Sequence, residues 1–433
     1  MFRAMREPNF RKWLIGALVT SIGSWAHRTA QDWVVLTELT DHDAVAVGIS
    51  LSLQFGPIFI LGPFVGTLVD RFNGRKILIF TTAAEGVLAL ILGLTVLTGV
   101  ASLPLLYSLA LGLGIVQSLE APARQTFVGE LVGTKLLPNA VALNSTMFNS
   151  SRLIGPAIAG VLITTAGTGW VLTLASAGYF GGIIAMLSMR QSLFHPMKKI
   201  TTTKGGFAAG LRYIGTRGDL KVLLVMVFIV GALVFNYSIF GSTMAVIEFG
   251  LGAHDYGFIT SALALGSIVG SLLVARSARP RLTVIILGAT GVGVAAVLSA
   301  IAPTVTAFMF VYPLLGLASI TMVATTNAYL QTTTEPEYRG RVMAMYTTVL
   351  IGGTPFGSPL VGWLANEFGP RWAVSAAAVG GFAAALIAYI WIRRTHHLKL
   401  TPAIRSSFSR ERDEFDPESS ETQMITLTER GPQ

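Results

Sequence analysis

Long apolar stretches without charge recur through the whole 433-residue chain, and they constrain its fold more than any other feature. About 20 consecutive apolar residues make a helix long enough to cross a bilayer. Only 12% of the residues are charged, about half the share of a soluble domain, and the mean hydropathy is +0.64. The sequence therefore predicts an all-α integral membrane protein. We expect twelve transmembrane helices, near residues 12–36, 45–69, 76–98, 103–126, 140–165, 169–190, 219–245, 256–276, 282–302, 305–330, 340–365 and 371–392.

Basic residues mark alternate connections between these spans. Arg3, Arg6, Arg11 and Lys12 precede the first span, and later basic residues gather in every second connection. The other connections are short and nearly free of charge. Because cytoplasmic loops are enriched in lysine and arginine, we expect a multi-pass protein of the plasma membrane with both termini in the cytoplasm. The net charge of +9 follows from the same loops and does not indicate nucleic-acid binding.

A glycine and tryptophan pattern occurs twice, 202 positions apart. The six spans between the copies are an even number, so the two halves are predicted to be parallel, as in some transporters with internal repeats. Coincidence among 46 glycines is the alternative, but a tryptophan in register favours a repeat. The matched residues are Gly155, Gly160, Gly167 and Trp170 in the first copy and Gly357, Gly362, Gly369 and Trp372 in the second.

The repeat and the changes in composition divide the chain into four parts. Residues 1–190 and 219–394 are expected to form two six-helix halves, joined by a cytoplasmic linker over residues 191–218. Within the linker, Phe207–Ile214 is a candidate short helix on the inner membrane surface. Residues 395–433 are polar and charged with few apolar side chains, which predicts a disordered cytoplasmic tail.

The loop after the second span carries a specific pattern. It resembles the signature of the major facilitator superfamily, G-x-x-x-D-R-x-G-R-R/K, although Asn73 stands where that family usually has glycine. The resemblance implies a gate in which Asp70 caps the eleventh span, which begins near Gly340. The alternative is that the basic residues only set orientation. The second half has Val274 where Asp70 would fall, so the gate is expected to be asymmetric. The gate residues are Gly66, Asp70, Arg71, Gly74, Arg75 and Lys76.

The first copy of the repeat resembles the fifth-helix signature of drug/proton antiporters in the same superfamily. A proline kinks such a helix, and small residues let it pack closely against its neighbours. A role in coupling and a purely structural role in packing both fit this pattern. The residues concerned are Ser151, Arg152, Gly155, Pro156 and Gly160.

Charged and amide side chains lie inside several predicted spans, where they are costly and therefore expected to be functional. Arg28 and Asp32 stand four residues apart, as do Glu120 and Arg124, so each pair shares a helix face and can form an ion pair. The alternative is that each pair only specifies packing. The superfamily lines its cavity with the first, fourth, seventh and tenth helices. Candidate cavity residues are Arg28, Gln31, Asp32, Glu120, Arg124, Asn236, Asn327 and Gln331.

Several local runs, such as Ala121-Pro-Ala-Arg-Gln and Arg339-Gly-Arg-Val-Met, resemble the bacterial branch of this superfamily that exports enterobactin and drugs. The resemblance implies a major facilitator fold and proton-driven export of small amphipathic organic molecules by alternating access. Asp32 is the expected proton carrier, with Glu120 as its rival. Uptake or facilitated diffusion of a metabolite is the alternative, and a membrane enzyme or receptor is a remote one.

The residues expected of cofactor, metal or enzyme chemistry do not gather in the sequence. The chain has no cysteine, and five of its six histidines fall in predicted connections or the tail. We therefore expect no metal, no cofactor and no enzymatic activity. The expected partners are a small-molecule substrate, protons and the lipid bilayer, without nucleic acid, and the protein is expected to be a monomer.

Overall fold

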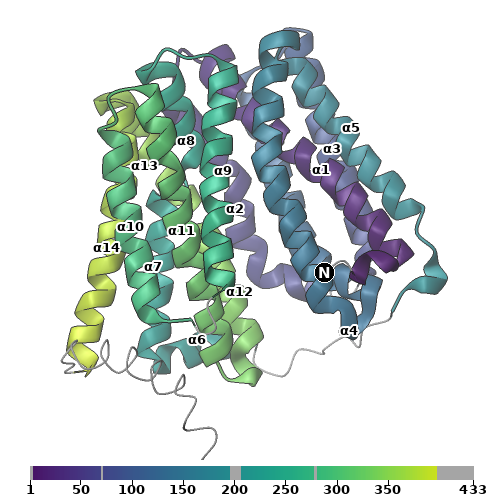
Figure 1. Ribbon diagram of the computed structural model, residues 1–433. Helices are drawn as coiled ribbons and strands as arrows, with labels where there is room; N and C mark the ends of the chain where they lie inside the picture. The colour runs from purple at the N-terminus through teal and green to yellow at the C-terminus, as the bar shows by residue number, and fades with distance from the viewer. Residues whose placement is uncertain (1–2, 70–71, 196–205, 277–279, 397–433) are drawn as a thin grey trace, which may run out of the picture. The chain divides into compact units, whose positions relative to one another are not determined.

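The computed structural model describes residues 3–69, 72–195, 206–276 and 280–396, and every regular element in these residues is helical (Figure 1). The chain divides into one unit of Met1–Ile387 and a second of Ala388–Gln433, of which the end of the last helix is described. Of the predicted tail, only residues 395 and 396 lie within the described residues. The all-α prediction is confirmed.

The first half contains five long helices, preceded by a short 3₁₀ turn at Arg3–Arg6. Helix α1 packs against α4 and α5, and α3 also packs against these two. The helices are α1 (Pro8–Trp33), α2 (Ala44–Val69), α3 (Gly74–Leu97), α4 (Leu103–Ala166) and α5 (Thr168–Leu187).

The second half follows a short helix, α6 (Gly206–Thr216), which confirms the helix predicted near Phe207–Ile214. Its seventh predicted span is interrupted near Asn236, and its eleventh is made of two consecutive helices. The helices are α7 (Gly218–Leu233), α8 (Tyr237–Thr243), α9 (Ala253–Ala275), α10 (Leu282–Ala300), α11 (Val305–Thr333), α12 (Pro336–Gly352), α13 (Thr354–Phe368) and α14 (Pro370–His396).

Nine helical segments of the described residues are long and apolar enough to cross a membrane. The other three predicted spans correspond to α1, to the second part of α4, and to α12 with α13, all of which are helical but do not meet the same standard of length and apolarity. The structure is thus a multi-pass helical membrane protein in which twelve spans can be followed.

The connection expected between the fourth and fifth spans is not a loop. The two spans are two helices, together labelled α4, that meet at a kink at Gly133, where φ is 68° and ψ is 176°. These dihedrals lie in a region open almost only to glycine. Charged residues at membrane boundaries predicted a loop here, but the segment continues its helical hydrogen bonding on either side of one residue.

The two halves repeat a second feature that the glycine pattern does not contain. A π-helical turn ends the first span at Val34–Glu38, and another ends the seventh span at Met244–Glu248. In both, the closing glutamate contacts the start of a later helix. The hydroxyl of Thr168 donates to Glu38, and Arg371 Nε donates to Glu248 at 2.7 Å.

The repeated glycines lie at close helix crossings. A Cβ on Gly160 would lie 2.7 Å from the Ala253 carbonyl oxygen at the start of α9, and a Cβ on Gly362 would lie 2.4 Å from the Ala44 carbonyl oxygen at the start of α2. Each crossing joins one half to the other, since α4 packs against α9 and α13 against α2. The repeat therefore marks the two places where the halves meet most closely at one end of the bundle.

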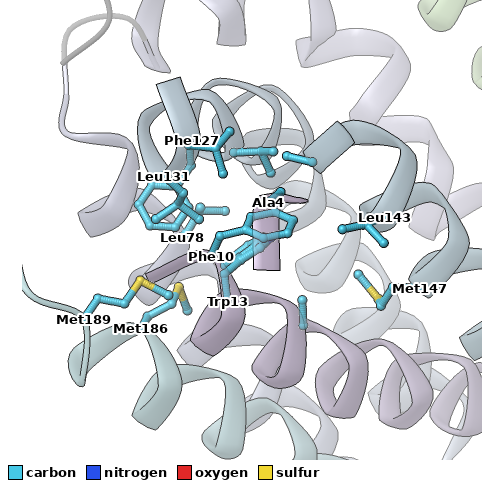
Figure 2. Close-up of a cluster of buried hydrophobic side chains, with 14 of the residues drawn as sticks. Ala4, Phe10, Trp13, Leu78, Phe127, Leu131, Leu143, Met147, Met186 and Met189 are labelled. Carbon is cyan, nitrogen blue, oxygen red and sulfur yellow. The ribbon is translucent and has the colours of Figure 1, made fainter. Parts of the chain in front are cut away.

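A cluster of buried apolar side chains holds the opposite end of the first half together (Figure 2). Phe10 and Trp13 of α1 contribute to it, and Trp13 meets Phe127 edge to face with ring centroids 5.2 Å apart. The backbone N–H of Ala4 donates to Asn139 Oδ1 at 2.8 Å, which ties the N-terminal turn to α4. This cluster fixes α1, α3, α4 and α5 relative to one another beside the cavity described next.

Candidate functional site

A cavity of ≈ 800 Å³ lies among helices of the first half and reaches α11 and α12 of the second half. Its size is in the range of small-molecule sites. Apolar and aromatic side chains, including Trp25 and Phe148, share its lining with polar ones. The charged and amide residues that line it are Arg28, Glu85, Gln117, Glu120, Arg124, Asn144 and Gln331.

Glu120 and Arg124 form the ion pair that their spacing predicts. Helix α4 places residues four apart on one face, and Arg124 Nη2 donates to Glu120 Oε1. The Arg124 guanidinium also lies 5.8 Å from the ring centroid of Trp13, in the apolar cluster. Glu85 of α3, buried to 4% exposure, faces both members of the pair. Two carboxylates and one guanidinium therefore meet at the cavity wall.

Arg28 does not form the predicted ion pair with Asp32. Its guanidinium lies 5.2 Å from the ring centroid of Trp25 and 5.2 Å from that of Phe55, so it is held between two aromatic rings. Cation–π contacts of this kind attract the guanidinium through the ring quadrupole. Arg28 lines the cavity as expected.

Asp32 lies instead at the contact between the halves. Its Oδ2 accepts a hydrogen bond from the Tyr256 hydroxyl of α9 at 3.4 Å, while Oδ1 is buried without a hydrogen-bond partner. Trp33 stacks on the Tyr256 ring with centroids 6.1 Å apart. Asp32 is only 2% exposed and is not among the residues that line the cavity. The carboxylate is therefore buried where α1 meets α9 and does not line the cavity.

Arg152 of α4 lies between the two halves as well. Its guanidinium is 5.6 Å from the ring centroid of Trp25 in the first half and 5.9 Å from that of Tyr237 in the second. Its neighbour Ser151 bonds the Met147 carbonyl of its own helix, and Gly155 leaves room for Trp25 against α4. Pro156 stays inside α4, where its carbonyl oxygen lies close to Gly257 of α9.

The amide side chains expected in the cavity have different positions. Gln31 is buried and donates to the Ser50 hydroxyl of α2 at 3.1 Å. Asn236 is fully buried between α7 and α8, where it accepts from the Ser358 hydroxyl of α13 at 2.6 Å. Gln331 lines the cavity and donates to Asn327 Oδ1 at 2.7 Å. Of these amides, the cavity lining includes Gln331, while Asn236 joins two helices.

The gate loop is described only in part, because Asp70 and Arg71 lie outside the described residues. Gly66 belongs to α2, and Gly74 begins α3. Asn73, which departs from the family pattern, caps α3 by accepting from the Lys76 backbone N–H at 3.3 Å.

The two basic residues that follow in this loop differ in their surroundings. Arg75 donates to the Met186 carbonyl at 2.8 Å and so holds the end of α5 in its own half. Lys76 is exposed.

Sequence reasoning did not assign roles to several residues that build the site. Glu85 was recognisable as a charge inside a span, but its two charged neighbours come from α4. The partner of Asp32, Tyr256, is 224 positions away and carries no charge that singles it out. Phe55 has no local signal. No group of three metal-ligating side chains occurs among the residues that the structure describes.

The chain was also compared with protein families and with known proteins. A family model described as transmembrane secretion effector matches residues 1–421. The enterobactin exporter EntS of Shigella flexneri is 28% identical over 362 residues, covering 82% of this chain and 84% of the exporter. EntS of Escherichia coli strain K12 is 26% identical over 380 residues, covering 85% and 88%.

Solved structures share the fold at low identity. A bacterial homologue of the human lysosomal transporter Spinster, in an inward-facing and unoccupied conformation, superposes with a TM-score of 0.70 at 15% identity over 89% of this chain and 98% of that one. A D-xylose–proton symporter gives a TM-score of 0.69 at 13% identity over 89% and 97%.

Proposed function

Because this chain belongs to the transmembrane secretion effector family of the major facilitator superfamily, we propose that it exports small amphipathic organic molecules of siderophore-like or drug-like chemistry. Its family and relatives are transporters and not enzymes. The relatives are named as exporters of enterobactin, which supports export as the direction of transport.

The observation that carries the proposal is the mixed lining of the cavity. Trp25 and Phe148 offer apolar ring surface, while Arg28 and the Glu120–Arg124 pair offer charge and hydrogen bonds. Polar groups set among apolar walls favour ligands that have both kinds of surface. A volume of ≈ 800 Å³ accommodates a small organic molecule.

Alternating access is proposed as the mechanism, by rocking of the two halves. The close crossings at Gly160 and Gly362 join the halves at the end where α2 and α9 begin. The cavity residues Glu120, Val128 and Leu137 lie toward the other end of the first half. Breaking the crossings while the other end closes exposes the same cavity to the opposite side of the membrane.

Proton antiport is proposed as the energy source, with Asp32 as the carrier. Its contact with Tyr256 of the other half supports this assignment, since rocking changes the surroundings of the carboxylate. Glu120 remains the rival, because it lines the cavity and is paired with Arg124. Each carboxylate can be replaced by an amide of nearly the same size, in Asp32→Asn and Glu120→Gln.

We place the protein in the plasma membrane as a monomer with both termini in the cytoplasm. Basic residues before α1 and in alternate connections support this orientation. Tags after Thr98, within Gly252–Asp255 and at the C-terminus are expected to report outside, outside and cytoplasm. A C-terminal tag found outside would contradict both the orientation and the even number of spans.

Efflux from a panel of siderophores and drugs tests the function. In inverted vesicles that contain the protein, a substrate should accumulate when a pH gradient is imposed and much less when the gradient is collapsed. Vesicles without the protein are the control. Accumulation that does not depend on the gradient would leave export in place and exclude proton antiport. Movement of substrate only down its own gradient, in both vesicle orientations, would favour facilitated diffusion.

A further inference from the structure

Two arginines share one indole at the edge of the cavity. The guanidinium of Arg28 lies 5.2 Å from the Trp25 ring centroid, and that of Arg152 lies 5.6 Å from it. Phe55 continues the series beyond Arg28, and Tyr237 continues it beyond Arg152. Rings and cations therefore alternate from α2 of the first half, through α1 and α4, to α8 of the second half.

Neither arginine is matched by an acceptor. Elsewhere in the described residues, Arg124 pairs with Glu120, Arg217 with Asp219 and Arg371 with Glu248. No ion pair or hydrogen bond of the Arg28 or Arg152 side chain occurs in the part of the chain that the structure describes. An unpaired guanidinium inside a membrane protein is costly, and such groups normally pair or face a water-filled cavity. Aromatic contacts hold these two in place but leave their N–H groups without acceptors.

The position of the two cations fits a ligand site. Arg28 and Trp25 line the cavity, and Phe148 meets the Trp25 ring edge to face at 5.8 Å. Both arginines are only partly buried, and of the two Arg28 lines the cavity. Asp32 and Glu85 act on Arg28 at longer range than a direct ion pair. A guanidinium prefers planar oxyanions, which it binds through two parallel hydrogen bonds.

We infer that the cavity binds a small organic anion in which an aromatic ring carries a carboxylate or a comparably planar oxyanion. The oxyanion pairs with Arg28, the charge of Arg152 adds to the attraction from the far side of Trp25, and the ring of the ligand packs against Trp25 and Phe148. This assignment rests on the proposed function, because it names the chemical class that the exporter takes.

Binding of matched probes to the purified full-length protein in detergent tests the inference. The probes are 2-naphthoate, its neutral isostere 2-naphthamide and the cation 2-naphthylmethylammonium, followed by calorimetry. Naphthoate should bind tightest to the wild type, a comparison that needs no variant. Arg28→Gln should weaken naphthoate binding about 10- to 100-fold, because it removes charge-assisted hydrogen bonds, and should leave naphthamide binding nearly unchanged.

Matched variants separate charge from folding. Arg28→Lys keeps the cation and should retain part of the affinity, and Arg152→Gln should lower it less than Arg28→Gln, because Arg152 does not line the cavity. Arg276→Gln removes an exposed cation at the end of α9 and should change nothing. Size-exclusion profiles check that each variant is folded.

Two outcomes overturn the anion site. One is equal or tighter binding of the amide or the cation by the wild type, and the other is unchanged naphthoate affinity in folded Arg28→Gln. If either occurs while the vesicles still export a substrate, the anion site fails and the proposed function stands. If naphthoate binding depends on Arg28 but no substrate is exported, the anion site stands and the proposed function fails.

Discussion

The two halves of the protein share a plan but differ in where they hold charge. Aligning the π turns at Val34–Glu38 and Met244–Glu248 places Ser238 opposite Arg28 and Ser242 opposite Asp32. In the first half the spans carry arginines and carboxylates, whereas the equivalent region of the second half is joined by neutral hydrogen bonds. Asn236 accepts from Ser358, and Tyr237 donates to Ser319 at 2.6 Å.

The two halves of a repeated fold can therefore have different roles in forming the cavity. The first half supplies most of the cavity lining and all of its charged residues, and the second half contributes Gln331 and Ile351. Yet both halves keep the glycine crossings, because these depend on backbone approach and not on side-chain chemistry. Symmetry is retained in packing and lost in charge.

The largest effect is expected at Gly362, the tighter of the two crossings. In Gly362→Ala, the new methyl group would lie 2.4 Å from the Ala44 carbonyl oxygen, so the halves must separate at this end. Overpacking of this kind costs about 1–3 kcal/mol, and we expect initial efflux rates in inverted vesicles to fall about tenfold or more.

Gly160, the residue that matches Gly362 in the repeat, gives a second test of the same effect. Gly160→Ala should reduce efflux less, since its Cβ would lie 2.7 Å from the Ala253 carbonyl oxygen. Gly252→Ala, at the same end but in open space, is the control and should export normally. Wild-type efflux by folded Gly362→Ala would show that close approach at this crossing is dispensable.

The next effect concerns Asp32, whose matching position in the second half is the neutral Ser242. Asp32→Asn should abolish the stimulation of efflux by a pH gradient while substrate binding persists, because the amide cannot carry the proton. Ser242→Ala, at the matching position of the second half, should leave the stimulation intact. Efflux rates with and without the gradient, together with binding by calorimetry, measure both.

A different result would move the assignment within the first half. If Asp32→Asn retains full proton-coupled efflux and Glu120→Gln loses it, the proton carrier belongs to the cavity pair on α4. The proton carrier would then still belong to the first half, but it would be Glu120 and not Asp32.

A smaller loss is expected from Asp70→Asn in the gate loop. The second half has Val274 at the equivalent position, so the loop is a further site where the halves differ. Efflux should fall severalfold at near-normal expression, because the change would weaken the helix cap that the family resemblance implies for Asp70. Arg276→Gln, which removes an exposed cation at the end of α9 in the second half, is the control. Unchanged efflux in Asp70→Asn would favour a role in orientation alone.

The smallest effect is expected at Asn366 of α13, whose side chain caps the N-terminus of α2. Asn366 Oδ1 accepts from the Ala44 backbone N–H at 2.9 Å, and its Nδ2 donates to Asp43 Oδ1 at 2.7 Å. Asn366→Ala should lower the free energy of unfolding by about 1 kcal/mol, the usual cost of a lost cap. Thermal unfolding in detergent measures it.

The residue that matches Asn366 in the repeat provides the control. Thr164 bonds the Gly160 carbonyl of its own helix and caps nothing in the other half. Thr164→Ala should therefore change stability by no more than about 0.5 kcal/mol. Equal losses in the two variants would contradict a capping role for Asn366.

Much of the fold could be predicted from the sequence because its signals are local or periodic. Apolar length indicated the helices, and the spacing of Gly155 and Gly160 indicated the repeat before any contact was known. The Glu120–Arg124 pair followed from helical spacing alone. The two spans within α4 were predicted, but the direct junction between them at Gly133 was not, because its charged flanks resemble those of a loop.

The partners of the site residues could not be predicted in the same way. Arg28 and Asp32 have the spacing of an ion pair, but Phe55 and Trp25 take the guanidinium and Tyr256 takes the carboxylate. These partners come from the positions of other helices. Aromatic residues are also common in membrane spans, so nothing in the sequence distinguishes the ones that contact Arg28.

Helix α4 has a mechanical consequence for the first half. Its two arms meet at Gly133, where the backbone leaves helical geometry, and Pro122, Pro138 and Pro156 within the arms each lack the N–H that a helical hydrogen bond needs. One arm carries Glu120 and Arg124 at the cavity, and the other carries Gly160 at the crossing with α9. The bend at Gly133 therefore connects the wall of the cavity to the crossing at Gly160, and a change in its angle would move one relative to the other.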